Sequence, residues 1–151
     1  MNLKELIGNG DRIGLFTAPF VILGVTLNIM FPSFFEVGGP SGILRAISVV
    51  VLLPGVVIWI WSVILIVTRV PRKELMSTGP YSLVKHPLYT SVSFLVLPWI
   101  GILCDTWLGV ALGIILYVAS RFFSREEEKV LSTTFGVAWD EYRRNVKVPW
   151  L

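Results

Sequence analysis

The sequence predicts an all-α integral membrane protein, a helical bundle of about four transmembrane helices followed by a C-terminal cytoplasmic amphipathic helix. Three observations predict this class. Apolar residues make up 54% of the 151 residues, and charged residues only 15%, against roughly 25% in an ordinary soluble domain. The mean hydropathy is +0.75. The few charges also cluster in segments that alternate with long charge-free stretches. We therefore expect the whole chain, 1–151, to form a single membrane domain.

Four stretches contain no Asp, Glu, Lys or Arg: 13–35, 46–68, 87–104 and 106–120. A helix needs about 20 apolar residues to cross a hydrocarbon core of about 30 Å. The first two stretches reach that length. The last two are shorter and are separated only by Asp105, which favours a helical hairpin. The expected spans are about 13–35, 46–68, 87–104 and 106–123. Three spans plus a re-entrant segment are the alternative.

Proline and glycine residues favour kinks and close packing within these spans. Pro98 falls inside the third span, and Gly109 and Gly113 form a G-x-x-x-G pattern in the fourth. Such glycines let a neighbouring helix approach closely. The Pro98 kink and the two glycines would alternatively leave a gap between helices that is wide enough for an apolar chain.

The distribution of basic residues predicts the orientation. Two Lys or Arg precede the first span, one lies in the first loop, four lie in the second and none lies in the third, while six lie from Arg121 onwards. The positive-inside rule then places both termini and the 69–86 loop in the cytoplasm, and Glu36 and Asp105 on the other side. The membrane would be the inner membrane of a prokaryotic cell or the endoplasmic reticulum of a eukaryotic one.

Composition also limits the partners. The net charge of +3 follows from the topology, so no nucleic acid partner is expected. The single Cys104 and the single His86 exclude an internal disulfide and leave no ligand set for a metal site. The expected surroundings are membrane lipids, and the sequence does not predict an oligomeric state.

Charged residues concentrate in two segments on the same predicted side of the membrane, 69–89 and 121–149. Sixteen of the 23 charged residues lie there. In the first segment Pro87 suits the first position of a helix, which places His86 at the N-cap. In the second segment Arg121, Arg125 and Glu128 share one helical face. The alternative interpretation is a capping histidine and a solvated helix face without a site.

The second segment also predicts how the chain ends. Gly136 is expected to end the fourth helix as a C-cap residue. The short amphipathic helix over 137–147 would carry Trp139, Tyr142 and Val146 on one side. Such a helix is expected to lie on the membrane surface and to cover a pocket.

Two motifs in these segments resemble a known family. They read GPYSLVKHPLYTS and, after the predicted hairpin, EEKVLSTTFGVAWDEYRRNVKVP. This order resembles the isoprenylcysteine carboxyl methyltransferase and phospholipid methyltransferase superfamily over roughly residues 70–151. Gly79-Pro80-Tyr81, His86-Pro87 with Tyr89, Glu127-Glu128 and Phe135-Gly136 stand at the spacing of the family pattern. Lys85 stands where arginine is usual in the family.

The resemblance implies a fold without a nucleotide-binding sheet, in which S-adenosylmethionine binds at the cytoplasmic face and S-adenosylhomocysteine is the product. The residues implied to bind this cofactor are Tyr81, His86, Pro87, Tyr89, Glu127, Glu128 and Tyr142. Arg121, Arg125 and Glu127 would take part in catalysis, the arginines by orienting an anionic acceptor.

The resemblance further implies a lipid-like or prenylated small-molecule acceptor. Its methylated group remains open among a carboxylate, a phospholipid amine and a small thiol. A non-catalytic membrane subunit on the same scaffold, or a related reductase-like protein, is the competing hypothesis.

Overall fold

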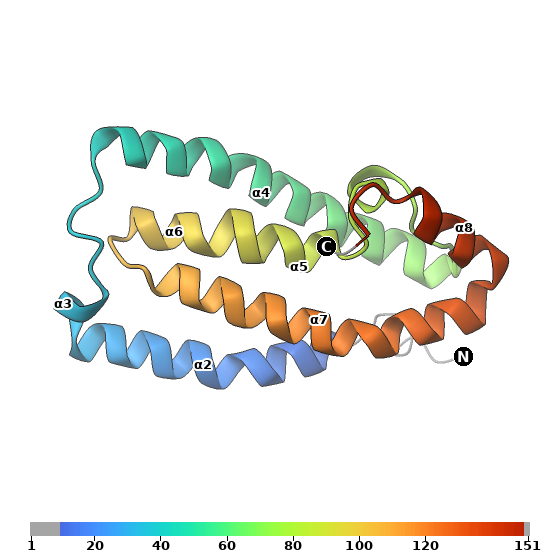
Figure 1. Cartoon of the computed structure of the whole chain (residues 1–151), viewed down its shortest axis with the longest axis horizontal. Coiled ribbons are helices and arrows are strands. Elements are labelled where there is room, and N and C mark those ends of the chain that lie inside the picture. Colours follow the sequence, from blue (N-terminus) through green and yellow to red (C-terminus); the bar gives the residue numbers. More distant parts are fainter. Residues whose placement is uncertain (1–9, 150–151) are drawn as a thin grey trace.

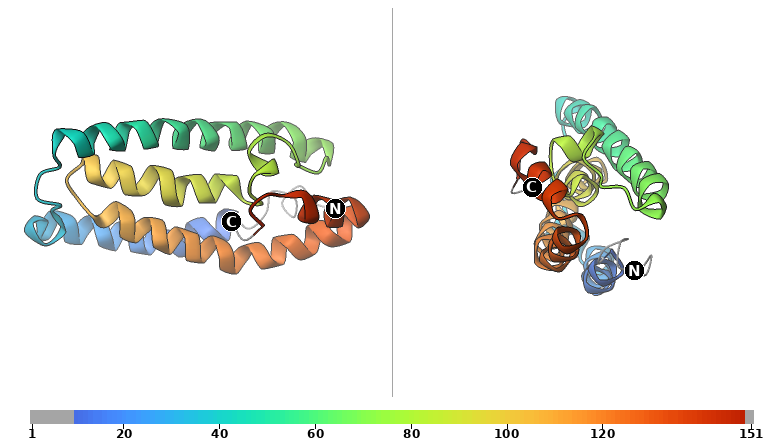
Figure 2. Two further views of the ribbon diagram at one scale, coloured as in Figure 1. Left: turned by 45° about the horizontal axis from the view of Figure 1, so that its top comes forward. Right: turned by 90° about the vertical axis from the view of Figure 1, so that its right-hand side faces the viewer.

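The long helices of the molecule run side by side along its longest axis (Figure 1). The computed structural model describes residues 10–149, which are helical and contain no strand apart from isolated bridges. Three long helices pack with a fourth, interrupted helix, which lies between α4 and α7, while α2 packs on the far side of α7 (Figure 2). The long helices are α2 (Gly10–Met30), α4 (Gly42–Arg69) and α7 (Leu108–Phe135), and the interrupted helix comprises α5 (Pro87–Ser91), η3 (Val92–Val96) and α6 (Leu97–Leu103). The all-helical class is confirmed.

Proline breaks the first expected span. The stretch 13–35 does not form one helix, because α2 ends at Met30 and a short helix, α3 (Pro32–Phe35), follows it. A proline disfavours helical geometry in the residue before it, and Phe31 has φ −132° and ψ 61°. The chain therefore turns at this point, before the loop that leads to α4.

A row of small residues joins α4 to the interrupted helix. Ser48, Gly55 and Ser62 lie seven residues apart on one face of α4, and all three are buried. A Cβ added to Gly55 would lie 2.6 Å from the Cβ of Leu95. Small side chains thus allow the two backbones to approach closely, as expected for helices packed in a membrane.

The helical hairpin is packed even more tightly. A Cβ on Gly109 would collide with the carbonyl oxygen of Leu97, and a Cβ on Gly113 with that of Ser93. The gap that Pro98 and these glycines were expected to leave for an apolar chain is therefore filled by backbone. The interrupted helix contains a π-helical turn, η3, directly before Pro98, where the missing N–H and the ring disturb the regular hydrogen-bond ladder.

Within residues 10–149, three helices are long and apolar enough to cross a membrane: Gly10–Met30, Gly42–Arg72 and Leu108–Phe135. The interrupted helix, Pro87–Leu103, is apolar but shorter, so the count of four spans stays a prediction. Large apolar side chains point outwards along the bundle; Ile22 is 68% exposed and Leu53 is 62% exposed. Such apolar surfaces fit a lipid environment rather than water.

Hydrogen bonds tie together the end of the bundle that carries α3. The backbone N–H of Gly39 donates to Asp105 Oδ1 at 2.9 Å, and the Trp107 indole N–H donates to the carbonyl of Phe34 at 3.0 Å. The rings of Phe35 and Trp107 stack with centroids 5.0 Å apart. The loop after α3 is thereby fastened to the turn of the hairpin.

The opposite end carries the polar segments. Two short 3-10 turns, η1 (Val70–Arg72) and η2 (Gly79–Ser82), lie there with the last helix, α8 (Val137–Asn145). Gly136 ends α7 at φ 51°, as its predicted C-cap role requires. The apolar face of α8 is not free, because Trp139, Tyr142 and Val146 form a buried cluster against other parts of the protein. That α8 also lies on a membrane stays a prediction.

Candidate functional site

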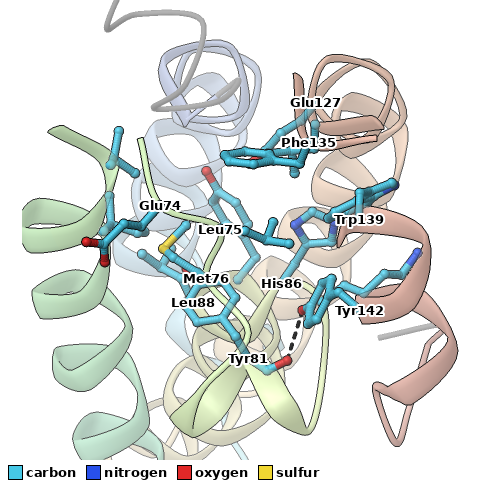
Figure 3. A pocket seen from close by; sticks show the side chains of 15 residues that line it. Glu74, Leu75, Met76, Tyr81, His86, Leu88, Glu127, Phe135, Trp139 and Tyr142 are labelled. Carbon is cyan, nitrogen blue, oxygen red and sulfur yellow. Dashed lines mark hydrogen bonds between the residues drawn. The ribbon is translucent and has the colours of Figure 1, made fainter. Parts of the chain in front are cut away.

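A cavity at the polar end brings together side chains from all the segments that meet there (Figure 3). We call it the Glu127 cavity. Its lining comes from the end of α4 with η1, the extended segment 73–78, η2, the start of α5, and the facing parts of α7 and α8. The lining residues are Ile66, Val70, Glu74, Leu75, Met76, Tyr81, Lys85, His86, Leu88, Tyr89, Glu127, Leu131, Phe135, Trp139 and Tyr142.

The turn η2 holds Tyr81 in the cavity wall. Gly79 begins this turn at φ 63°, a conformation that favours glycine, and a Cβ there would lie 3.0 Å from the Trp61 ring. The Tyr142 hydroxyl donates to the carbonyl oxygen of Tyr81 at 2.9 Å. Burial, followed by the nearby Glu127 carboxylate, raises the pKa of Tyr81 above its usual range. Its phenol is therefore a neutral, protonated group.

His86 stands at the N-cap of α5, as predicted, and Pro87 occupies the first helical position. A proline is well placed there, since the N–H that it lacks would have no partner in the helix. The side chain of His86 is 10% exposed, and its Nε2 lies 3.4 Å from Glu128 Oε1. The start of α5 therefore presents the imidazole to α7.

Glu128 is held by two basic partners. Lys85 Nζ lies 2.5 Å from the same oxygen that His86 approaches, and the Lys85 side chain is only 9% exposed. Glu128 itself lies beyond the apolar part of α7, among the charged residues near the end of that helix. The hydrogen bond from His86, together with the hydrogen bond and the positive charge of Lys85, lowers the pKa of Glu128 to about 2, although burial acts in the opposite direction. Glu128 is thus an ionised residue that fastens α5 to α7.

Glu127 has a different environment. It lines the cavity beside Tyr81 and Tyr89, and within residues 10–149 no ion pair involves it. Burial raises the pKa of Glu127, His86 lowers it by a smaller amount, and the Glu128 charge raises it again. A partly buried carboxylate without an ion pair is costly, so this position suits a ligand that carries positive charge.

The structure gathers most of the sequence-predicted site residues around one space. Tyr81, His86, Tyr89, Glu127 and Tyr142 all line the Glu127 cavity. The remaining predicted residues lie elsewhere. Glu128 faces Lys85 and His86, and Pro87 is buried in the wall of a second space, described below. Arg121 is half-buried and Arg125 is exposed, and both lie outside the lining of the cavity.

The sequence did not predict several of the residues that line the cavity. Glu74, Leu75 and Met76 come from the 73–78 segment, where Glu74 Oε2 pairs with Arg69 at 2.8 Å. Leu75 and Met76 are two adjacent apolar residues in a charged loop, and this pattern could have indicated that they are partly buried. Trp139 was recognised only as part of an apolar face. Within the described part of the chain no group of His, Cys, Asp and Glu could hold a metal ion.

An apolar groove lies on the other side of the backbone that carries Tyr81 and Leu88. It has a volume of about 520 Å³ and lies between α4 and α5–η3. Pro80 and Pro87 line this groove, whereas their neighbours Tyr81 and Leu88 line the Glu127 cavity. The backbone of these two short stretches therefore separates a partly polar space from an apolar one. The groove is lined by Ile58, Trp61, Gly79, Pro80, Ser82, Leu83, Val84, Pro87, Thr90, Ser91, Phe94 and Leu95.

Comparison with known proteins adds the family. Neither the curated proteins nor the solved structures contain a match. The model of the isoprenylcysteine carboxyl methyltransferase (ICMT) family matches residues 43–133, which is more than half of the chain. The match includes α4 and both motif segments up to the last turn of α7, but neither α2 nor α8. The chain therefore belongs to the isoprenylcysteine carboxyl methyltransferase family.

Proposed function

We propose that this protein is an S-adenosylmethionine-dependent membrane methyltransferase that acts on a lipid-like acceptor at the cytoplasmic face. The observation that carries the proposal is Glu127, whose carboxylate lines a cavity with Tyr81 and Tyr89 and forms no ion pair among the described residues. Family membership supports the same activity.

The lining of the Glu127 cavity fits the charges and rings of S-adenosylmethionine. Glu127 would balance the sulfonium or the ammonium group of the cofactor. The faces of Tyr81 and Tyr89 suit a cation or a purine, and His86 offers a ring nitrogen to a carboxylate or hydroxyl group. When bound, the cofactor supplies a methyl group that is already activated for transfer.

The protein then has to position the reactants and exclude water. Phe135, Trp139 and Tyr142 form an apolar wall on the α7–α8 side of the cavity. Lys85 and Glu128 fix the start of α5 and, with it, His86. Fixed geometry and a dry site lower the barrier to an in-line displacement without acid–base assistance to the leaving group.

The apolar groove is the route that we propose for the acceptor. Its lining is mostly apolar, and it adjoins the part of α4 whose side chains face outwards, such as Trp61 at 50% exposure. An apolar chain in this groove would end at the wall formed by Pro80 and Pro87. The polar head would then need to pass only that wall to reach the Glu127 cavity.

The arginines distinguish the acceptor classes. Arg121 and Arg125 stay predicted as the groups that orient an anionic acceptor, although both lie outside the cavity lining. With a carboxylate acceptor, replacing either by alanine should raise KM or lower kcat while cofactor affinity stays nearly unchanged. With an amine or thiol acceptor, both variants should behave as wild type.

Cofactor binding provides the first test. We expect purified protein to bind S-adenosylhomocysteine in isothermal titration calorimetry. Glu127→Gln should weaken the binding of S-adenosylmethionine, which carries both the sulfonium and the ammonium group, about tenfold or more, since a hydrogen bond to a charged group contributes about 1.5–3 kcal/mol. Glu126→Gln is the matched control, because Glu126 is the neighbouring carboxylate but is exposed and paired with Arg12. Equal affinity in all three proteins would contradict the proposed site.

Turnover provides the second test. Labelled methyl groups should pass from S-adenosylmethionine to a component of a membrane lipid extract. Binding without any transfer would favour the non-catalytic subunit. Efficient methylation of a water-soluble acceptor, with no gain from an added apolar tail, would contradict the route through the groove.

A further inference from the structure

The Glu127 cavity is small for the ligand proposed above. Its volume is about 50 Å³, whereas pockets for small molecules and cofactors usually measure about 300–1,000 Å³. A ligand of that class therefore needs additional space, which one of the cavity walls must provide when it moves.

A second space lies directly beyond one of these walls. We call it the α8 groove. It has a volume of about 480 Å³ and lies between the 73–78 segment, η2 and α8. Ser77, Ser82, Glu141 and Asn145 contribute polar groups to it, so this groove suits a hydrophilic ligand. It belongs to the polar end of the molecule, where η2 and α8 lie.

Leu75 and Tyr142 border both the Glu127 cavity and the α8 groove. They differ in how firmly they are held. Tyr142 is 7% exposed, its hydroxyl donates to Tyr81, and its ring packs 5.4 Å from that of Trp139. Leu75 has only apolar contacts, with the cluster formed by α8. Leu75 is therefore the border residue that can move at lower cost.

The backbone around Leu75 also favours movement as a unit. Residues 74–77 have no regular secondary structure. Left-handed residues bound this stretch on both sides, Lys73 at φ 56° and Gly79 at φ 63°. The ion pair between Arg69 and Glu74 holds the start of the stretch and is partly exposed to solvent. No side-chain hydrogen bond of Leu75 or Met76 has to break when the stretch shifts.

We propose that Leu75 is the gate between the α8 groove and the Glu127 cavity, and that the cofactor enters and leaves through this groove. The inference rests on the proposed function, since it concerns the same cofactor. Outward movement of Leu75 joins the two spaces into one, and its return encloses the ligand against Tyr81 and Glu127. The acceptor and the cofactor would then use different sides of the protein, the apolar groove and the α8 groove.

A gate has a kinetic signature that an ordinary contact residue lacks. Truncating a gate lowers the barrier in both directions, so the association and dissociation rates rise together and Kd changes little. Truncating a contact residue removes binding energy, so dissociation accelerates while association stays constant. The two rate constants therefore distinguish the two roles of Leu75.

Leu75→Ala and Leu131→Ala form a matched pair for this test. Both leucines line the Glu127 cavity and pack on the same α8 cluster, but only Leu75 borders the α8 groove. Association and dissociation of S-adenosylhomocysteine would be measured by surface plasmon resonance on the full chain in nanodiscs. For Leu75→Ala both rates should rise by about tenfold, equivalent to about 1.4 kcal/mol off the barrier. For Leu131→Ala the association rate should match that of wild type.

A second measurement does not require truncation of an apolar residue. In a Cys104→Ser background, Ser77→Cys in the α8 groove and Ser132→Cys on the exposed part of α7 would each be labelled with a bulky maleimide. Both positions are exposed, but only Ser77 lines the groove. The label at position 77 should slow association and dissociation about tenfold or more, and the label at position 132 should change neither.

Two results would overturn the gate alone: an unchanged association rate in Leu75→Ala, or exchange at the wild-type rate with position 77 labelled. Wild-type protein that binds neither S-adenosylmethionine nor S-adenosylhomocysteine would instead overturn the proposed function, and the gate with it.

Discussion

Glu127 and Glu128 are neighbours in the sequence with opposite surroundings. Lys85 and His86 hold Glu128 and lower its pKa to about 2, whereas burial raises the pKa of Glu127. A motif of two glutamates predicts that both belong to the site but cannot assign their tasks. The structure separates them, because Glu128 joins two helices and Glu127 faces the cavity.

The raised pKa of Glu127 leads to a pH dependence of cofactor binding. Below that pKa the carboxylate is neutral and cannot balance a cation. The affinity for the cofactor therefore falls as the pH falls through this pKa, and it reaches its full value above the pKa. We expect the affinity for S-adenosylmethionine to rise as the pH rises through the raised pKa of Glu127. Calorimetry at several pH values should give a flatter profile for Glu127→Gln, which isolates Glu127 from other titrating groups. Parallel profiles would show that Glu127 does not contact the cation.

The Lys85–Glu128 pair should contribute to stability more than an exposed pair does. Lys85→Met leaves the partly buried Glu128 without its lysine and should lower the free energy of unfolding by about 3 kcal/mol. The control is Arg12→Met, which removes a pair whose side chains are 60% and 63% exposed and should cost less than about 1 kcal/mol. Thermal unfolding in detergent would measure the stability of both variants. Equal losses would contradict the larger contribution of the Lys85–Glu128 pair.

The pH dependence of the same pair has a defined sign. Because the folded pKa of Glu128 is lowered to about 2 from its usual 4.5, the stabilising effect of its ionised carboxylate is complete above that usual value. It is lost only as the pH falls from there towards 2. The difference in stability between wild type and Lys85→Met should therefore be the same at pH 5 as at pH 7, within about 0.5 kcal/mol.

Among the elements, the glycine contacts of the hairpin make the sharpest prediction. Gly109→Ala forces a methyl group against the Leu97 carbonyl, which belongs to a helix backbone and cannot turn away. We expect a loss of about 1–3 kcal/mol in unfolding free energy. Gly14→Ala is the control, since nothing lies within 4 Å of its added Cβ, and it should be neutral or stabilising by up to about 1 kcal/mol. Similar stability of the two variants would contradict the tight hairpin.

Charge-free stretches predicted most helices because hydropathy reports how much of the chain avoids water. They did not predict the break at Phe31, since a proline near the end of a span is compatible with several backbone paths. The π-helical turn η3 was also not predicted. Pro98 predicted a kink in this helix but not the hydrogen-bond register of the turn before it, which packs against Gly55 and Gly113.

For the whole molecule, orientation is the main prediction still to be tested. Glu36 lies at the α3 end of the bundle and Ser77 at the polar end, and both are exposed. In a Cys104→Ser background, Glu36→Cys should react with an impermeant maleimide only from outside the cytoplasm. Ser77→Cys should react only after the membrane is opened. Labelling of both positions from one side would contradict the expected topology.

The sequence predicted the class, the polar end and five of the residues that line the cavity, because these depend on charge placement and on short motifs. It could not predict contacts that join distant segments. Arg12 on α2 pairs with Glu126, and the Tyr89 hydroxyl lies 3.2 Å from a Cβ added to Gly10. Leu75 and Met76 likewise acquire their place only when the 73–78 segment folds over the cavity.

The wall between the Glu127 cavity and the apolar groove is a single layer of backbone formed by two short stretches, with Pro80 and Pro87 on one side and Tyr81 and Leu88 on the other. The same few residues therefore determine the shape of both spaces. A substitution that reshapes one of them displaces the other, so variants selected for a new preference in the groove should carry compensating changes at cavity positions. Directed evolution of this protein would have to mutate neighbouring positions in pairs, since a single substitution in this wall affects both the cavity and the groove.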